Sequence, residues 1–175
     1  MLRSALFAAL LATTLTPAPA AAQTRTSALA GQDTGAPIDI DADRIEIRDE
    51  ISQAVFIGRV VIRQGRLTLN ADRVTILYTR VGENPEMQRL DARGSVKLVS
   101  PSETITATNA IYDVPARLIT MLGNVVLNRQ GSNLNGQRLV LNLASGATSF
   151  DARSAGQPAG RVTGRFIVPE RTPAK

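Results

Sequence analysis

Three aspartates at alternating positions are the densest group of residues in this chain that could carry out chemistry. Asp39, Asp41 and Asp43 are separated by apolar residues, so in a strand they would share one face about 7 Å apart, at roughly 3.3 Å per residue. Such carboxylates could bind Ca²⁺ or act as the acid and base of a glycosidase. The same alternation is typical of the solvated face of an edge strand, and we favour this second interpretation.

Other catalytic chemistry is poorly supported by the composition. The 175 residues include no His and no Cys, which removes the usual general base, the thiol nucleophile and the soft metal ligands. The sequence has no G-x-x-x-x-G-K-[ST] phosphate-binding loop. With four Phe, two Tyr and no Trp, it has few residues for a sugar-stacking or base-stacking platform. We therefore predict a binding or scaffold protein that is not an enzyme and needs no metal or cofactor.

The chain is basic, with a formal net charge of +5. The basic residues are scattered instead of forming a run, which argues against a nucleic-acid partner. Almost all of them are Arg, whose guanidinium group pairs bidentately with phosphate. The composition therefore suits a different anionic partner.

The N-terminus has the pattern of a secretory signal peptide. Arg3 precedes an apolar run at residues 5–15, and Ala20 and Ala22 satisfy the A-x-A cleavage rule. The run is shorter than the ~20 residues that span a bilayer. We predict a signal peptide at residues 1–22, cleaved near Ala22, then a flexible lead-in at 23–37, one domain at 38–168 and a flexible tail at 169–175.

From residue 38 onward, apolar and polar residues alternate as they do in half-buried strands. Short alternating runs recur as far as residue 168, separated by turn residues such as Gln64-Gly65 and Gln130-Gly131. No window in this region keeps a helical period. Many short strands at even spacing predict an all-β fold.

The alternating region also contains a repeat. Each unit has a glycine that opens one strand and an apolar anchor in another. The glycines are Gly58, Gly94, Gly123 and Gly164, and the anchors are Ile45, Val74, Ile111 and Leu139. Units of this length bury their apolar face only against neighbours, so they predict a stacked array. The predicted edge strands are residues 38–42 and 161–168.

The repeat assigns one apolar face to the interior. Its predicted members are Ile45, Ile47, Phe56, Val60, Ile62, Leu67, Leu69, Val74, Ile76, Val96, Leu98, Ile105, Ile111, Met121, Val125, Leu127, Leu139, Leu141 and Phe166. Periodicity alone does not distinguish a closed core from an open groove lined by these residues, and from the residues alone we favour the closed core. The scarcity of large aromatic residues favours some space between the sheets.

The order of these segments resembles a known family. The stretch "IDIDADRIEIRDEISQAVFIGRVVIRQGRLTLNADRVTILY", with its paired "ADRIEI" and "ADRVTI", is followed by "ITMLGNVVLNRQG". This set is similar to the OstA-like domain of the LptA family of periplasmic lipopolysaccharide transport proteins. The resemblance covers most of the mature chain, and the sequence departs from the family pattern in the loop at residues 80–86, the lead-in and the tail.

The resemblance implies an open, twisted, V-shaped antiparallel β-jelly roll with an apolar interior. It also implies a periplasmic bridge that carries lipopolysaccharide from the inner to the outer membrane, with the lipid A acyl chains in a groove lined by the predicted interior residues. The bridge would assemble head to tail with itself and with two partners of the same domain type, one anchored in the inner membrane and one inserting lipopolysaccharide at the outer membrane.

The phosphorylated headgroup would stay outside the groove. Arg59, Arg63, Arg66 and Arg73 alternate outward and are the candidates to contact it, although they are equally consistent with plain solubilising residues.

Two other functions remain open at this point. A carbohydrate-active enzyme would work through Asp39, Asp41 or Asp43. A structural envelope adaptor would bridge other proteins with a closed core, and it would stack without binding lipid.

Overall fold

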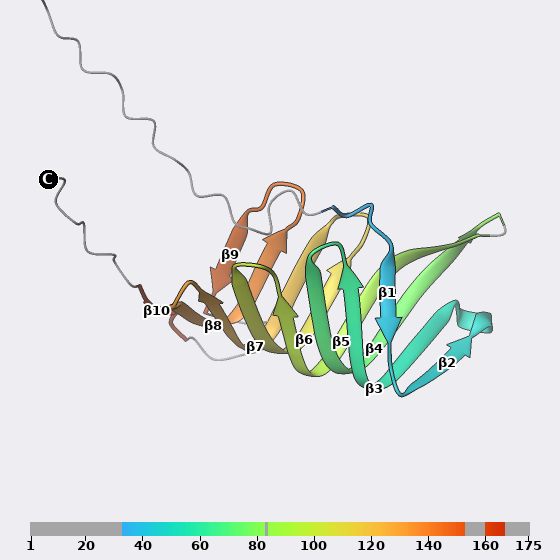
Figure 1. The fold of residues 1–175 in the computed structure, drawn as a ribbon, viewed down its shortest axis with the longest axis horizontal. Coiled ribbons are helices and arrows are strands. Elements are labelled where there is room, and N and C mark those ends of the chain that lie inside the picture. Colours follow the sequence, from blue (N-terminus) through green and yellow to red (C-terminus); the bar gives the residue numbers. More distant parts are fainter. Residues whose placement is uncertain (1–32, 83, 153–159, 167–175) are drawn as a thin grey trace, which may run out of the picture.

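The chain forms one antiparallel β-sheet that bends over onto itself (Figure 1). The computed structural model describes residues 33–82, 84–152 and 160–166. Across these residues the sheet has ten strands in the spatial order β1-β3-β4-β5-β6-β7-β8-β10, with β2 also paired to β3 and β9 also paired to β8. The elements are β1 (Ile38–Asp41), β2 (Arg44–Arg48), the 3-10 turn η1 (Asp49–Ile51), β3 (Gln53–Gln64), β4 (Leu67–Val81), β5 (Asn84–Val99), β6 (Glu103–Asp113), β7 (Leu118–Arg129), β8 (Ser132–Asn142), β9 (Thr148–Asp151) and β10 (Thr163–Arg165). The predicted all-β, open antiparallel fold is confirmed.

The predicted domain limits fall partly outside the described residues. The signal peptide at 1–22, most of the lead-in at 23–37 and the tail at 169–175 are not among them, so these limits stay predictions. The first strand begins at Ile38. Over the described ranges, no helix has the length and apolar character that a membrane crossing requires.

Tight turns join the long strands into a meander. Between β7 and β8, Arg129 pairs with Ser132, and the two residues between them have φ angles of 49° at Gln130 and 80° at Gly131. Positive φ at both central residues defines a type I′ turn, whose twist matches that of the flanking strands. The sequence-predicted turn at Gln130-Gly131 therefore holds two long strands in register.

A bulge repeated at one level bends the sheet. The strands β3, β5 and β7 each contain one extra residue relative to their neighbours, and the register shifts at that point. At each bulge a glycine and the residue after it both have positive φ: Gly58 and Arg59, Gly94 and Ser95, and Gly123 and Asn124. Bulges of this kind bend a strand and increase its twist. Figure 1 shows the successive strands turning at the same level.

The bend divides the sheet into two arms that face each other. The first arm runs from β2 to β9 and the second arm runs from β1 to β10, and β3 to β8 pass through both. The side chains between the arms form one apolar core. The repeat in the sequence therefore encodes successive bent strands that enclose an interior.

The glycines at the bend are needed for space as well as for φ. A Cβ atom on Gly94 would collide with the carboxylate of Asp72, and a Cβ atom on Gly123 would lie 2.8 Å from Thr108 Oγ1. The Thr108 hydroxyl also donates a hydrogen bond of 3.2 Å to the carbonyl oxygen of Gly123. The aspartate of the "ADRVTI" segment thus lies over the glycine of the next strand.

One glycine of the predicted repeat does not follow this pattern. Gly164 pairs with Leu134 in β10 and has no positive φ. β10 covers only three residues and meets the second arm alone, so it has no bend to make. The prediction that Gly164 is equivalent to Gly58, Gly94 and Gly123 is wrong for this reason.

We expect Gly94→Ala to destabilise the protein more than Gly82→Ala. Both glycines have positive φ, which costs an alanine about 1–2 kcal/mol. A Cβ at Gly82 meets nothing within 4 Å, whereas one at Gly94 must displace Asp72, which adds about 1–3 kcal/mol. Chemical denaturation would measure both free energies of unfolding. Equal losses in the two variants would show that Asp72 does not pack against the bend as described.

Candidate functional site

The apolar interior between the two arms is the candidate functional site. Most of its predicted residues are buried there. These are Val60, Ile62, Leu67, Leu69, Val74, Ile76, Val96, Leu98, Ile105, Met121, Val125, Leu127, Leu139 and Leu141. Phe56 is partly buried and packs against this cluster. The alternation in the sequence therefore located the interior face in β3, β4, β7 and β8.

Two predicted interior residues lie elsewhere. Ile111 pairs with Asp91 and Thr120, and its neighbours Ala110 and Tyr112 are the buried ones, so Ile111 faces outward. The alignment of the third unit was one residue out of phase because the small side chain of Ala110 gives a weak apolar signal. Phe166 follows β10 and is 67% exposed.

The interior face continues to the edge of the sheet at β2. Ile45 pairs with Phe56 and Ile47 pairs with Ala54, which places both isoleucines on the interior side. They are nevertheless 52% and 62% exposed. β2 forms this end of the first arm, so the apolar interior opens at this edge.

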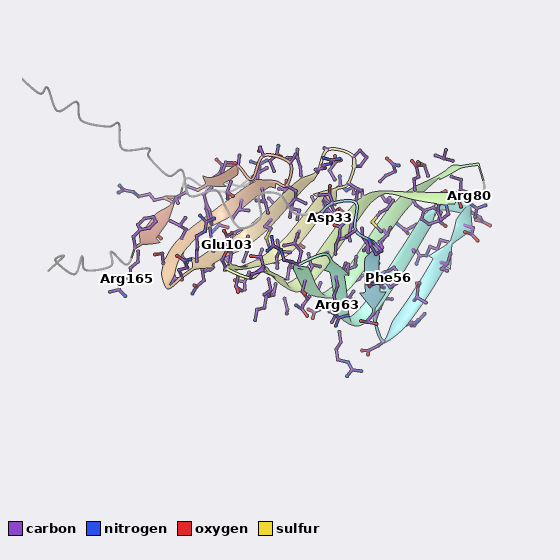
Figure 2. All side chains as sticks on the ribbon, turned by 45° about the horizontal axis from the view of Figure 1, so that its top comes forward. Asp33, Phe56, Arg63, Arg80, Glu103 and Arg165 are labelled. Carbon is purple, nitrogen blue, oxygen red and sulfur yellow. The ribbon has the colours of Figure 1, made fainter. Side chains whose placement is uncertain are left out.

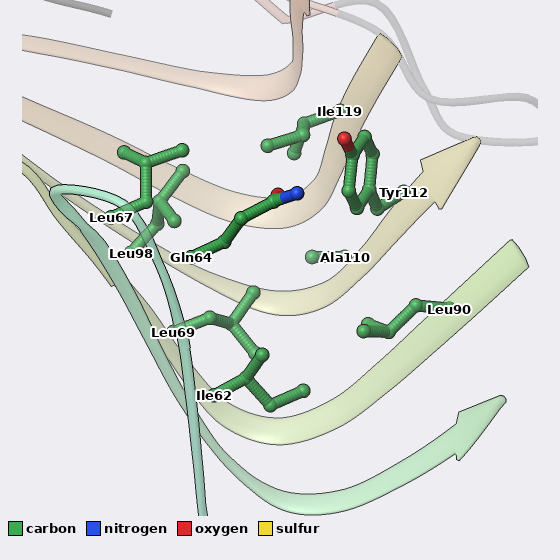
Figure 3. Close-up of a pocket in the computed structure, with 9 residues that line it drawn as sticks. All are labelled: Ile62, Gln64, Leu67, Leu69, Leu90, Leu98, Ala110, Tyr112 and Ile119. Carbon is green, nitrogen blue, oxygen red and sulfur yellow. The ribbon is translucent and has the colours of Figure 1, made fainter. Parts of the chain in front are cut away.

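A pocket lies between the free ends of the arms, where the bend is farthest away (Figure 3). Its cavity volume is about 40 Å³, and about 430 Å³ of empty space around it extends into open solvent. The lining residues are Ile62, Gln64, Leu67, Leu69, Leu90, Leu98, Ala110, Tyr112 and Ile119. Five of these residues were not predicted from the sequence: Gln64, Leu90, Ala110, Tyr112 and Ile119. The alternating pattern also runs through residues 90–92 and 110–112, and it could have identified the inward positions there. It could not have shown that residues of the two arms line one pocket.

Two polar side chains enter this otherwise apolar pocket from opposite sides. The Gln64 amide nitrogen donates hydrogen bonds of 3.0 Å to the carbonyl oxygen of Thr34 and 3.2 Å to that of Ala36. These bonds attach the segment before β1 to a wall of the pocket. Tyr112 is 7% exposed, and its hydroxyl has no hydrogen-bond partner within the described residues. Burial raises the pKa of this hydroxyl, with a smaller opposing effect of the Arg117 charge, so Tyr112 is neutral.

A polar layer closes part of the free end of the second arm. Glu103 is buried, and its carboxylate pairs with Arg129 at 2.6 Å. The backbone N–H of Glu103 donates to the Ser100 hydroxyl at 3.2 Å. A buried carboxylate needs such partners because desolvation disfavours its charged form. The apolar interior therefore ends in the Glu103–Arg129 ion pair on this side.

Two of the four predicted headgroup arginines are already in ion pairs. Arg63 pairs with Asp41 across β1 and β3, and Arg59 Nε donates to Asp43 at 3.0 and 3.1 Å. The Arg59 hydrogen bond is the largest cause of a lowered pKa at Asp43. Arg66 and Arg73 are exposed. An anion that binds Arg59 or Arg63 must compete with the carboxylate already paired there. The ion pairs found among the described residues include neither Arg66 nor Arg73, so an anion would meet no such competition at those two.

The three aspartates of the acidic cluster are exposed. Asp41 and Asp43 form ion pairs with arginines, as edge residues commonly do, and β1 ends at Asp41. Within residues 33–82, 84–152 and 160–166, no group of three or more carboxylates lies close enough to hold a metal ion. The arrangement supports the interpretation of this cluster as a solvated strand face.

One family model matches most of the described part of the chain. Residues 39–147 match the family model described as LptA/(LptD N-terminal domain) LPS transport protein. An uncharacterized protein of Rhizobium meliloti (strain 1021) is 30% identical over 122 residues, which cover 66% of this chain and 66% of that protein. The lipopolysaccharide export system protein LptA of Escherichia coli (strain K12) is 25% identical over 113 residues, which cover 61% of this chain and 60% of that protein. The match thus spans less than two thirds of either relative.

A solved structure has the same fold. LptH of Pseudomonas aeruginosa, described as the LptA homologous periplasmic component of the conserved lipopolysaccharide transport device, superposes with a TM-score of 0.68 and 19% sequence identity. The superposition covers 78% of this chain and 99% of that one. At this identity the likeness is evidence for the fold alone.

We expect Arg59→Gln to raise the pKa of Asp43 toward its ordinary value of about 3.9. The folded-state pKa is lowered by Arg59, so the pair contributes stability above the unfolded pKa and loses it as the pH falls through the lower folded value. Carboxyl NMR titration would measure the shift. Arg63→Gln, which removes the separate pair with Asp41, is the control and should leave Asp43 unchanged. An unaltered Asp43 pKa in Arg59→Gln would contradict the assignment.

Proposed function

The chain belongs to the LptA/LptD N-terminal domain family of lipopolysaccharide transport proteins, and on this premise we propose that it is a periplasmic lipopolysaccharide carrier. The acyl chains would occupy the interior between the arms, and the chain would bridge the inner and outer membranes together with family partners. The observation that carries this proposal is the apolar interior face, which continues through successive strands and reaches the sheet edge at Ile45 and Ile47. The family is one of transport proteins, which argues against an enzyme.

The energetics of the interior suit an acyl chain. Each CH₂ group moved from water into an apolar site contributes about 0.8 kcal/mol. Successive strands present Val, Ile, Leu and Met side chains on the interior face. Because adjacent positions offer similar surfaces, a chain could shift from one to the next with little net change in free energy. This property favours transit over storage at one depth.

Entry beyond the pocket requires the arms to separate. Val74, Met121 and Leu139 are 0% exposed, so an acyl chain reaches them only by replacing the contacts between the arms. Those contacts are apolar and non-directional, so they can be exchanged for contacts with an acyl chain. The pocket near Ile62 is the place where such an exchange could begin, because it already contains empty space.

The edges of the sheet support head-to-tail assembly. β1 and β2 lie at one end of the sheet and β9 and β10 at the other, and Figure 2 shows Arg165 of β10 at the end opposite β2. Edge strands expose unpaired backbone groups that a neighbouring chain can complete. β1 carries the exposed Asp39 and β10 carries the exposed Arg165, so these two charges are complementary. A contact between unlike ends propagates into a filament.

A structural adaptor is the second candidate. The buried interior side chains form a closely packed cluster, which is the arrangement that a protein with a closed core would have. Such an adaptor would assemble through the same edges without binding lipid.

Photo-crosslinking to lipopolysaccharide separates these two functions. A photoreactive residue at Phe56 or Ile62 would face the interior, whereas one at the neighbouring Ile57 or Val61 would face outward. We expect adducts at 56 and 62 in yields several-fold above those at 57 and 61, because the acyl chains lie between the arms. Absence of adducts at 56 and 62, with self-association retained, would favour the closed adaptor.

We expect Ile47→Lys to weaken self-association about tenfold to a hundredfold, since burying an isoleucine contributes about 1.5–3 kcal/mol. Lysine at an edge also opposes pairing with another chain. Ile111→Lys is the matched control, because Ile111 lies on the outer face of the central strand β6 beside Asp91. Sedimentation velocity over a range of concentrations measures association, and circular dichroism checks the fold. Unchanged association in Ile47→Lys would exclude β2 from the interface.

A further inference from the structure

The Tyr112 hydroxyl is a hydrogen-bonding group in the pocket that the fold does not use. Tyr112 is 7% exposed, and its oxygen has no partner within the described residues. Buried polar groups in folded proteins are nearly always hydrogen-bonded, and leaving one unpaired is unfavourable. Phenylalanine would fill the same space without this cost. The hydroxyl therefore calls for an explanation outside the stability of the domain.

The residues in register with Tyr112 across the sheet are apolar. Tyr112 pairs with Leu90 on β5 and with Ile119 on β7. Continuing across the sheet in both directions, the positions in register are occupied by Ile76 and Leu141. All four are apolar, so Tyr112 places a polar group in a row that otherwise has none between β4 and β8.

The opposite wall does not supply a partner. It consists of Ile62, Leu67, Leu69 and Leu98, together with Gln64. The Gln64 amide nitrogen already donates to the carbonyl oxygens of Thr34 and Ala36. A ligand in this pocket would thus meet apolar walls, the Tyr112 hydroxyl and the Gln64 side chain, whose amide nitrogen is already bonded (Figure 3). Such a site suits an alkyl chain that carries a hydroxyl near its polar end.

We propose that this pocket binds the first carbons of a single acyl chain and that Tyr112 selects chains with a hydroxyl substituent close to the carboxyl group. This inference rests on the proposed function, since it names the kind of acyl chain that the interior accepts. The Tyr112 oxygen exchanges one hydrogen bond with the hydroxyl of the chain. The alkyl part lies against Leu69, Leu90 and Ile119, and the carboxyl end stays at the mouth.

The test compares two probes that differ by one hydroxyl group, tetradecanoate and 3-hydroxytetradecanoate. Dissociation constants would be measured by calorimetry with the chain expressed from residue 1 and with two variants. Tyr112→Phe removes only the pocket hydroxyl. Tyr78→Phe is the matched control, because the other tyrosine is on the surface, where its hydroxyl donates to Asp49 at 2.9 Å.

We expect the unmodified protein and Tyr78→Phe to bind the hydroxylated acid about fivefold more tightly, as one net hydrogen bond would give. In Tyr112→Phe the two acids should bind equally, with the tetradecanoate constant unchanged. The thermal midpoint of unliganded Tyr112→Phe should equal or exceed that of the unmodified protein, because no hydrogen bond is lost.

The inference is overturned if the unmodified protein does not distinguish the acids or binds neither, or if the preference survives in Tyr112→Phe. A lowered thermal midpoint in Tyr112→Phe would also overturn it, because the hydroxyl would then have a structural partner. Lipopolysaccharide crosslinking at positions 56 and 62, measured on the same preparations, reports separately on the proposed function. Crosslinking without acid preference would reject the role of Tyr112 and leave the carrier function standing.

Discussion

Each bulge contains two consecutive residues with positive φ, and the rest of this structure depends on that backbone conformation. A flat sheet of ten strands would leave both faces exposed to water, and its apolar face would be a liability. At Gly58, Gly94 and Gly123 the strands accept positive φ and one extra residue, and the sheet turns over its own apolar face. Because the bulges stand at the same level in alternate strands, one sheet supplies both walls of the interior.

This construction also explains why the interior is open at an edge. The interior is enclosed by one bent sheet, so the edge of each strand is covered only by the next strand in the order. At β2 there is no further strand, and Ile45 and Ile47 remain exposed although they continue the interior face. At the free end of the second arm, by contrast, Glu103 and Arg129 close part of the interior with an ion pair. The open edge at β2 and the partial closure at the second arm therefore come from different elements.

The sequence was sufficient to predict the fold class and much of the interior, and the limits have physical causes. Alternation is a local signal, so it identified Val60, Ile62 and Leu127 but lost its phase at Ala110, where the inward side chain is small. The pairing of Arg59 with Asp43 depends on how β2 and the corner before it lie against β3, which charge patterning does not specify. The pocket was missed because Gln64 and Tyr112 come from opposite arms and meet only after the bend.

The hydrogen bonding of the sheet bears on whether a closely packed interior can admit lipid. The ladder bonds run between neighbouring strands within each arm, while the arms face each other through apolar side chains. Separating the arms therefore exposes apolar surface without breaking the ladder. Water would make that exposure costly, but an acyl chain replaces the lost contacts with others of the same kind. A core that is closed in the absence of lipid is thus compatible with a carrier. The contacts that close it are apolar, and an acyl chain can replace them with apolar contacts of its own.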